Sequence, residues 1–156
     1  MSPTRTAVLV KPDGLQRGLI GEIINRFEKK GLKLVGMKMT VMSDDMLDRW
    51  YKEHRDKSFF EDLKSFMGSQ PIVAMVWEGI DAVPVVRKLV GTTLGREAEA
   101  GSIRGDFGMS QQLNLIHASS EEESAQEEID IVFGEDELFD YEWPMSNLIY
   151  AEYELK

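Results

Sequence analysis

Short apolar runs alternate with segments of helical spacing along the chain, and this order constrains the fold more than any single motif. Residues 7–10 are continuously apolar, which is typical of a strand covered on both faces. Apolar residues then recur at helical spacing over residues 19–27, and Gly31 is typical of a helix stop. Strict alternation over residues 35–41 follows, which predicts a strand with its apolar residues on one face and the other face exposed.

The middle of the chain continues this alternation. Two short helices are predicted over residues 46–51 and 59–67, followed by a strand over residues 72–77. The next helix has Asp81 as its predicted cap and Gly91 as its stop. Only the long segment after Gly91 breaks the pattern.

Periodicity disappears between Gly91 and Gln112, a length at which structureless loops in compact domains are usually functional. Residues 102–106 within this loop have the composition of a turn. A short strand is predicted over residues 113–116, with His117 at its end. Ser120 and Glu123 then predict a capping box for a last helix that extends to residue 133.

The resulting order is strand, helix, strand, helical hairpin, strand, helix, strand, helix. It predicts an α+β fold of ferredoxin-like type, in which a split βαβ motif (βαββαβ) forms an antiparallel four-stranded sheet covered by helices. Because the chain has 156 residues and no linker rich in Pro, Gly or Ser, one domain over residues 1–156 is expected.

Composition excludes several classes of partner. The formal net charge of -10 opposes binding to nucleic acid or to an anionic membrane, so neither is expected as a partner. No cysteine is present, which excludes disulfides and thiolate chemistry. Neither an apolar signal region nor a run long enough to span a membrane is visible in the sequence, and a cytoplasmic location is expected.

His117 is the leading candidate for a nucleophile. An imidazole is largely neutral at physiological pH and can attack an electrophile without a costly deprotonation. The alternative is a histidine that merely ends a strand and packs or caps there. His54, the only other histidine, lies in a highly charged stretch over residues 52–56 and is interpreted as a surface residue.

Two further patterns bear on this candidate. Lys11, Arg87 and Arg104 are cations placed near buried elements, which favours a phosphate site if they converge, and ordinary salt bridging if they do not. An acidic residue of the last helix could orient the imidazole. On a helical wheel Glu121, Glu122 and Glu128 border the apolar stripe, and the sequence geometry leaves all three open.

Several separated motifs, in the same order along the whole chain, resemble those of nucleoside diphosphate kinases. These motifs are Val10-Lys11-Pro12-Asp13-Gly14, Gln16-Arg17-Gly18-Leu19-Ile20-Gly21, Gly68-Ser69 with the segment to Gly79, Ile103-Arg104-Gly105-Asp106-Phe107, Asn114 to His117, and Glu123-Ser124-Ala125 with Glu128-Ile129. A set of ordered motifs is far more specific than any one of them.

The resemblance implies ping-pong transfer of a γ-phosphate from a nucleoside triphosphate to a nucleoside diphosphate through His117, with broad base specificity. It implies that Glu128 holds the second ring nitrogen and that Ser119 assists. The substrate-binding residues that it implies are Lys11, Arg87, Thr93 and Arg104 for the phosphates, Asn114 for the sugar 3′-hydroxyl, Phe59 for the base, and Tyr51 beside the lysine. Magnesium should arrive bound to the nucleotide phosphates rather than in a protein cage.

The sequence departs from the family pattern near the proposed nucleophile. Ala118 and Ser120 replace a glycine and an acid, and Gln111 replaces an aliphatic contact to the base. These changes define the alternative function, a nucleotide-binding regulatory protein of the same fold with weakened turnover. The family forms homo-oligomers, usually hexamers and sometimes tetramers, so self-association is expected.

Overall fold

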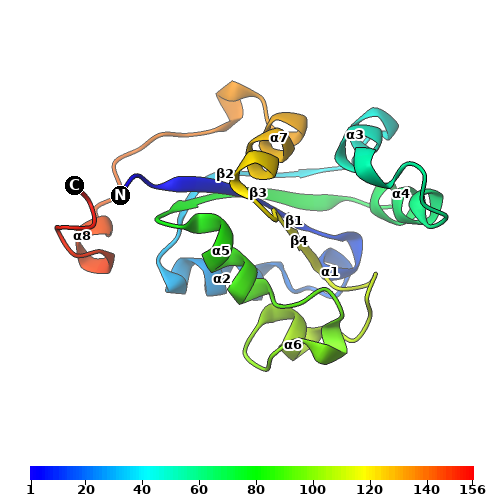
Figure 1. Ribbon diagram of the computed structural model, residues 1–156, viewed down its shortest axis with the longest axis horizontal. Coiled ribbons are helices and arrows are strands. Elements are labelled where there is room, and N and C mark those ends of the chain that lie inside the picture. Colours follow the sequence, from blue (N-terminus) through cyan, green and yellow to red (C-terminus); the bar gives the residue numbers. More distant parts are fainter.

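The computed structural model describes residues 1–156 and is organised around one four-stranded sheet (Figure 1). Its strands are β1 (Thr4–Val10), β2 (Lys33–Thr40), β3 (Ile72–Gly79) and β4 (Ile116–Ala118). They lie in the order β2-β3-β1-β4, and every neighbouring pair is antiparallel. The predicted α+β fold with a four-stranded antiparallel sheet is therefore confirmed.

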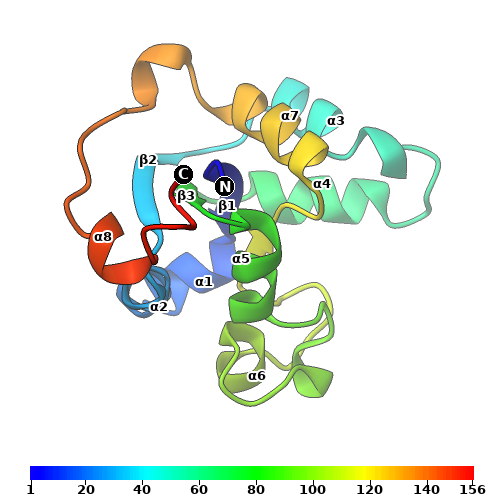
Figure 2. The same ribbon diagram turned by 60° about the vertical axis from the view of Figure 1, so that its left-hand side comes forward.

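Helices cover both faces of this sheet (Figures 1 and 2). One face carries α2 (Ile20–Lys30) and α5 (Ala82–Val90), and the other carries α3 (Asp44–Trp50), α4 (Phe60–Gly68) and α7 (Glu122–Val132).

Strand β1 contributes to both of the resulting cores, which explains its continuous apolar run. Val8 and Val10 pack into the core that contains α2 and α5, whereas Ala7 and Leu9 pack into the core that contains α3, α4 and α7. The α2 helix ends at Gly31, which has the left-handed φ of 98° predicted for a stop.

Two segments predicted as turns are short helices. α1 (Pro12–Gln16) starts directly after β1, and a proline in its first turn needs no hydrogen-bond partner. α6 (Ile103–Phe107) begins where the Ser102 Oγ accepts a hydrogen bond from the Gly105 N–H at 3.0 Å. The remaining short elements are η1 (Lys52–His54), η2 (Gly95–Glu97), η3 (Glu135–Glu137) and α8 (Ser146–Ile149).

Two helix starts differ from the prediction because other side chains supply the hydrogen bonds. Asp81 has a left-handed φ of 53° and makes no side-chain cap, and the Thr4 Oγ1 accepts the Ala82 N–H at 3.2 Å instead. At the start of α7, the predicted capping box of Ser120 and Glu123 is wrong. The Ser124 Oγ there accepts the Glu121 N–H at 3.2 Å.

Strand β2 forms one edge of the sheet, and its burial differs from the simple alternation. A register irregularity between Leu34 and Gly36 shifts the pairing with β3. Met37 and Met39 are 52% and 63% exposed, so the apolar residues of this strand face outward beyond the irregularity. None of the helices combines the length and apolar character needed to cross a bilayer.

Candidate active site

The register of β4 decides where the His117 side chain points. His117 lies in the middle of β4, whereas the sequence predicts a strand that ends at Ile116, one residue before it. His117 pairs with Leu9 of β1. Leu9 belongs to the core under α7, while Ile116 and Ala118 belong to the core on the opposite face. His117 therefore projects toward the face that α7 covers.

A tight turn at Leu115 leads into this strand. Leu115 is fully buried and has a φ of +76°, and the Ile116 N–H donates to the Asn114 oxygen at 2.9 Å across it. This is a γ-turn with positive φ, which is rare and strained, at a cost on the order of 1–3 kcal/mol for a residue other than glycine. Because of this turn, the pairing of β4 with β1 begins only at Ile116. β4 is therefore shorter than the sequence predicts and begins later.

Glu128 fixes the orientation of the imidazole. The His117 Nε2 lies 2.6 Å from the Glu128 Oε2. In the neutral form of the ring, this contact puts the proton on Nε2 and leaves Nδ1 with a free lone pair. Trp50 packs against the same ring with an interplanar angle of 71° and 5.0 Å between centroids. Of the three acidic candidates, Glu121 and Glu122 are exposed, and Glu128 is the one placed at His117.

Ser119 lies behind the histidine, not in the pocket in front of it. Its Oγ is 3.2 Å from the Glu128 Oε2 and accepts a hydrogen bond from the Ala7 N–H at 3.2 Å. The side chain is fully buried. Glu128 therefore contacts the His117 ring, Ser119 contacts Glu128, and neither residue lines the pocket.

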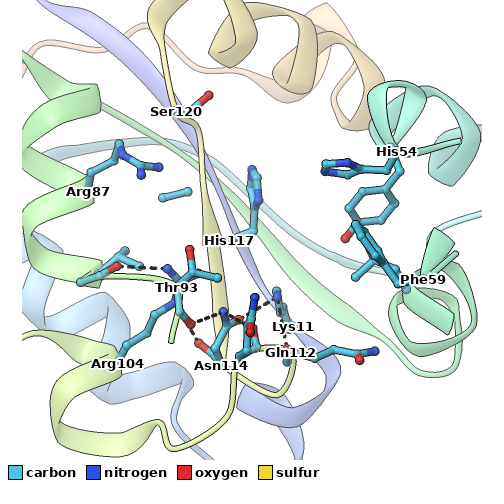
Figure 3. A pocket seen from close by; sticks show the side chains of 16 residues that line it. Lys11, His54, Phe59, Arg87, Thr93, Arg104, Gln112, Asn114, His117 and Ser120 are labelled. Carbon is cyan, nitrogen blue, oxygen red and sulfur yellow. Dashed lines mark hydrogen bonds between the residues drawn. The ribbon is translucent and has the colours of Figure 1, made fainter. Parts of the chain in front are cut away.

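In front of His117 lies a pocket of about 680 Å³ (Figure 3). It brings together eight of the residues predicted from the sequence: Lys11, Tyr51, Phe59, Arg87, Thr93, Arg104, Asn114 and His117. Figure 3 shows His117 near the centre, with Arg87 and Thr93 on one side and Phe59 on the other. The three cations proposed from the sequence thus converge on one cavity.

Lys11 is buried at the floor of this pocket. Its Nζ donates to the Asn114 Oδ1 at 2.7 Å and to the Gln112 oxygen at 3.4 Å. Burial, followed by the nearby charge of Arg104, lowers the pKa of Lys11 to about 8, although the Asp13 carboxylate acts in the opposite direction. Lys11 is therefore a positively charged group that loses its proton only slightly above physiological pH.

Arg104 is also buried and holds three backbone carbonyls. Its guanidinium donates from Nε to the Asn114 oxygen at 3.3 Å, from Nη1 to the Gly91 oxygen at 3.0 Å, and from Nη2 to the Ile116 oxygen at 2.5 Å. Burial, followed by repulsion from Arg87, lowers its pKa to about 10, so it stays charged at neutral pH. The side chain connects the loop after α5 to both ends of the γ-turn.

The opposite wall of the pocket is aromatic. Phe59 is 48% exposed, and the His54 ring lies 5.6 Å from it and 6.2 Å from the Tyr51 ring, centroid to centroid. The interpretation of His54 as a surface residue is wrong, because it is partly buried and lines the pocket. Burial also raises the pKa of the Tyr51 hydroxyl, which therefore remains protonated.

This arrangement suits a ligand that has a flat ring at one end and several negative charges at the other. Cations and hydroxyls line one side, an exposed ring lies on the other, and the His117 imidazole stands between them. No carboxylate lines the cavity, and no group of three or more His, Cys, Asp or Glu residues has the geometry of a metal site. The pocket therefore offers cations suited to phosphate recognition beside the His117 imidazole.

Comparisons with known proteins agree with this chemistry. The family model described as nucleoside diphosphate kinase matches residues 4–138. A nucleoside diphosphate kinase from Methanosphaera stadtmanae is 49% identical over 95% of this chain and 97% of its own length. One from Bacillus licheniformis is 52% identical over 94% of this chain and 99% of its own length.

Solved structures give the same result. The halophilic nucleoside diphosphate kinase from Halobacterium salinarum, in complex with CDP, superposes with a TM-score of 0.91 and 48% identity, covering 94% of this chain and 97% of that one. A nucleoside diphosphate kinase family protein from Babesia bovis superposes with a TM-score of 0.92 and 46% identity, covering 94% and 99%. On this evidence the chain belongs to the nucleoside diphosphate kinase family of phosphotransferases.

Proposed function

We propose that this kinase transfers phosphate through Nδ1 of His117 in a ping-pong reaction with broad base specificity. The observation that carries the proposal is an imidazole held at Nε2 by Glu128 and facing a pocket of converging cations. In the first half-reaction Nδ1 forms a bond to the γ-phosphorus, and the bond from that phosphorus to the β–γ bridging oxygen breaks. The nucleoside diphosphate leaves, and a second diphosphate takes the phosphoryl group by the reverse step.

The pocket supplies what phosphoryl transfer requires, which is positioning and stabilisation of charge. Lys11, Arg87, Arg104 and Thr93 bind the phosphates in this proposal, and Tyr51 packs beside them. Asn114 binds the sugar 3′-hydroxyl. Its Nδ2 already donates to the Thr93 and Gln111 oxygens at 2.9 Å each, so the second lone pair of its Oδ1, beside the one that accepts the Lys11 Nζ, accepts from the sugar. The relative solved in complex with CDP supports a diphosphate ligand for this pocket.

Magnesium enters this proposal on the β- and γ-phosphates. Mg²⁺ is commonly held by substrate phosphates and water with few protein ligands, and the pocket offers cations and neutral groups rather than carboxylates. When bound, it neutralises phosphate charge. Lys11, Arg87 and Arg104 are then the groups of this chain that orient the triphosphate toward His117.

Incubation with a nucleoside triphosphate labelled at the γ-phosphate tests the proposal. An acid-labile, alkali-stable label on His117 is expected, and a nucleoside diphosphate should then remove it. Binding without any label would instead support the alternative of a nucleotide-binding regulatory protein, which the replacements Ala118 and Ser120 beside the nucleophile favour.

Glu128→Gln should lower kcat on the order of 100-fold while changing nucleotide affinity little. The amide can donate as well as accept, so it no longer fixes the proton on Nε2. Pre-steady-state rates of His117 phosphorylation and binding titrations measure the two effects separately. Glu122→Gln on the exposed face of α7 is the matched control, and equal rates in both variants and the wild type would remove Glu128 from this role.

Phe59→Ala should weaken nucleotides of every base by a similar amount, on the order of 1–3 kcal/mol. Stacking uses the π-face that all bases share, and Phe59 presents a half-exposed ring to the pocket. Dissociation constants for adenine, guanine, cytosine and uracil diphosphates measure the effect. A loss confined to one base would indicate hydrogen-bond recognition instead.

Nucleotide affinity should fall as the pH rises above 8. Free Lys11 has a pKa of about 8, and bound phosphate raises that pKa because it favours the ammonium form. Affinity is thus fully present below pH 8 and declines above it, approaching about tenfold per pH unit. Titration calorimetry with a nucleoside diphosphate from pH 6.5 to 9.5 measures this decline, and Lys11→Arg should flatten it.

We also propose that the chain assembles into a homo-oligomer, a hexamer in preference to a tetramer. Met37 and Met39 on the edge strand β2, and Val41 directly after it, are exposed and support self-association. So do Leu148 and Tyr153 in the tail, which are each 78% exposed. Light scattering gives the number of subunits directly, and a monomer at micromolar concentration would contradict the proposal.

A further inference from the structure

Asp13 lies next to the turn that presents Asn114 and His117, although none of the roles proposed above includes it. It sits in the first turn of α1, two residues after Lys11. Its Oδ2 accepts the Leu115 N–H at 3.0 Å. Leu115 is the buried residue with positive φ at the centre of the γ-turn, so Asp13 holds the most strained point of the segment before the nucleophile.

The same short segment holds both polar backbone groups of Leu115. Its N–H bonds to Asp13, and its carbonyl oxygen accepts the Lys11 N–H at 2.9 Å. The fit is close, since a Cβ on Gly14 would lie only 2.6 Å from that oxygen. α1 and the γ-turn therefore form one unit, and a shift of Asp13 would displace the chain that leads to His117.

The Asp13 carboxylate also contributes charge to the pocket. It acts on both Lys11 and Arg104, and in each case it favours the protonated cation against burial and against repulsion between cations. Its Oδ1 is buried and has no hydrogen-bond partner among the protein atoms. Asp13 therefore provides a negative charge near Lys11 and Arg104, although it does not itself line the pocket.

We infer that Asp13 is a positioning residue of the kinase reaction, with two separable effects: its hydrogen bond fixes the γ-turn before His117, and its charge balances the phosphate-binding cations. The inference rests on the proposed roles of His117 and Lys11. It assigns to α1 a function beyond linking β1 to α2.

Other titratable groups surround Lys11 and have to be separated from Asp13. They are Tyr51 after α3, His54 in η1, Arg87 on α5, Arg104 on α6 and His117 on β4, with Glu128 of α7 behind His117. Lys11→Met identifies the part of the pH dependence that belongs to the lysine, because a variant without an amine at position 11 should lose that inflection.

Two substitutions separate the two effects of Asp13. Asp13→Asn keeps an oxygen that can accept the Leu115 N–H but removes the charge, whereas Asp13→Ala removes both. Asp45→Asn, an exposed carboxylate of α3, is the matched control for loss of one negative charge. Each protein is assayed for nucleoside diphosphate affinity from pH 6.5 to 9.5, for kcat at pH 6.5, and for unfolding in urea.

In Asp13→Asn the affinity inflection near pH 8 should move measurably to lower pH, while kcat at pH 6.5 stays within about threefold of the wild type. Asp13→Ala should also lose kcat, by about tenfold or more, because the turn is no longer held. Asp45→Asn should match the wild type in both assays.

An unshifted inflection in Asp13→Asn overturns the charge balance, and a wild-type kcat in Asp13→Ala overturns the positioning role. If Asp13→Ala is too unstable to assay, Asp13→Glu tests the positioning role instead. It keeps the charge but displaces the carboxylate by one methylene, so kcat should fall by about tenfold, and a wild-type kcat would overturn that role. His117 labelling of the wild type runs in parallel. Absence of that label rejects the proposed function itself, whereas a labelled wild type with unaffected variants rejects only the role of Asp13.

Discussion

Replacing His117 with alanine should abolish phosphate transfer while leaving nucleotide binding and the fold intact. His117 is the proposed nucleophile, and removal of a nucleophile commonly lowers kcat by a factor on the order of 10⁴ to 10⁶. The lost side chain is partly exposed, and its hydrogen bond is to Glu128 rather than to a structural backbone group, so the core should not collapse. Exchange of labelled phosphate between nucleotides measures the effect.

The control for this variant is nucleotide affinity. Lys11, Arg87 and Arg104 remain in place, so the dissociation constant of a nucleoside diphosphate should change only a few-fold. Retention of exchange at a rate near that of the wild type would assign the reaction to another group or to direct transfer between two bound nucleotides.

The sheet and its helices were predictable because they depend on local periodicity. Residues 7–10 are apolar on both faces and therefore indicate a covered central strand, which β1 is. Gly31 ends α2 as expected. The edge strand β2 was predicted in extent but not in burial, since a register irregularity near Gly36 depends on pairing with β3 and leaves no sign in the residue pattern.

Short helices were harder to predict. α1 and α6 each have five residues, too few for a repeating apolar pattern, and both were interpreted as turns. The start of α6 depends on a single contact of the Ser102 Oγ with the Gly105 N–H, and α1 begins at Pro12 without a side-chain cap. The position of β4 depends on the γ-turn at Leu115, whose positive φ is held by Asp13 and Lys11 from a distant part of the chain.

Convergence of the site could be predicted only through the family resemblance. A helical wheel left three acidic residues open, and the packing of α7 on the sheet places Glu128 at His117. His54 was missed because its surroundings are charged. Its spacing, three residues after Tyr51 and five before Phe59, is the one signal that it belongs to the same aromatic wall.

Arg104→Lys should lower the free energy of unfolding by about 3 to 5 kcal/mol and weaken nucleotide binding as well. The guanidinium donates to the carbonyls of Gly91, Asn114 and Ile116 at once. A lysine keeps the charge, but its compact ammonium group cannot reproduce a planar fork that reaches three separate oxygens. At least two of these carbonyls would lose the donor that Arg104 supplies, and the turn before His117 would be held less firmly.

Urea unfolding measures the loss of stability, and Arg96→Lys provides the matched control. Arg96 lies in the same loop, is exposed, and makes one long hydrogen bond, to the Met109 oxygen at 3.4 Å, so its replacement should change stability by less than about 0.5 kcal/mol. If Arg104→Lys were as stable as Arg96→Lys, the three carbonyl contacts would not hold the γ-turn, and Arg104 would act only as a charge. If stability fell but affinity did not, Arg104 would be a structural arginine, and phosphate binding would depend on Lys11 and Arg87.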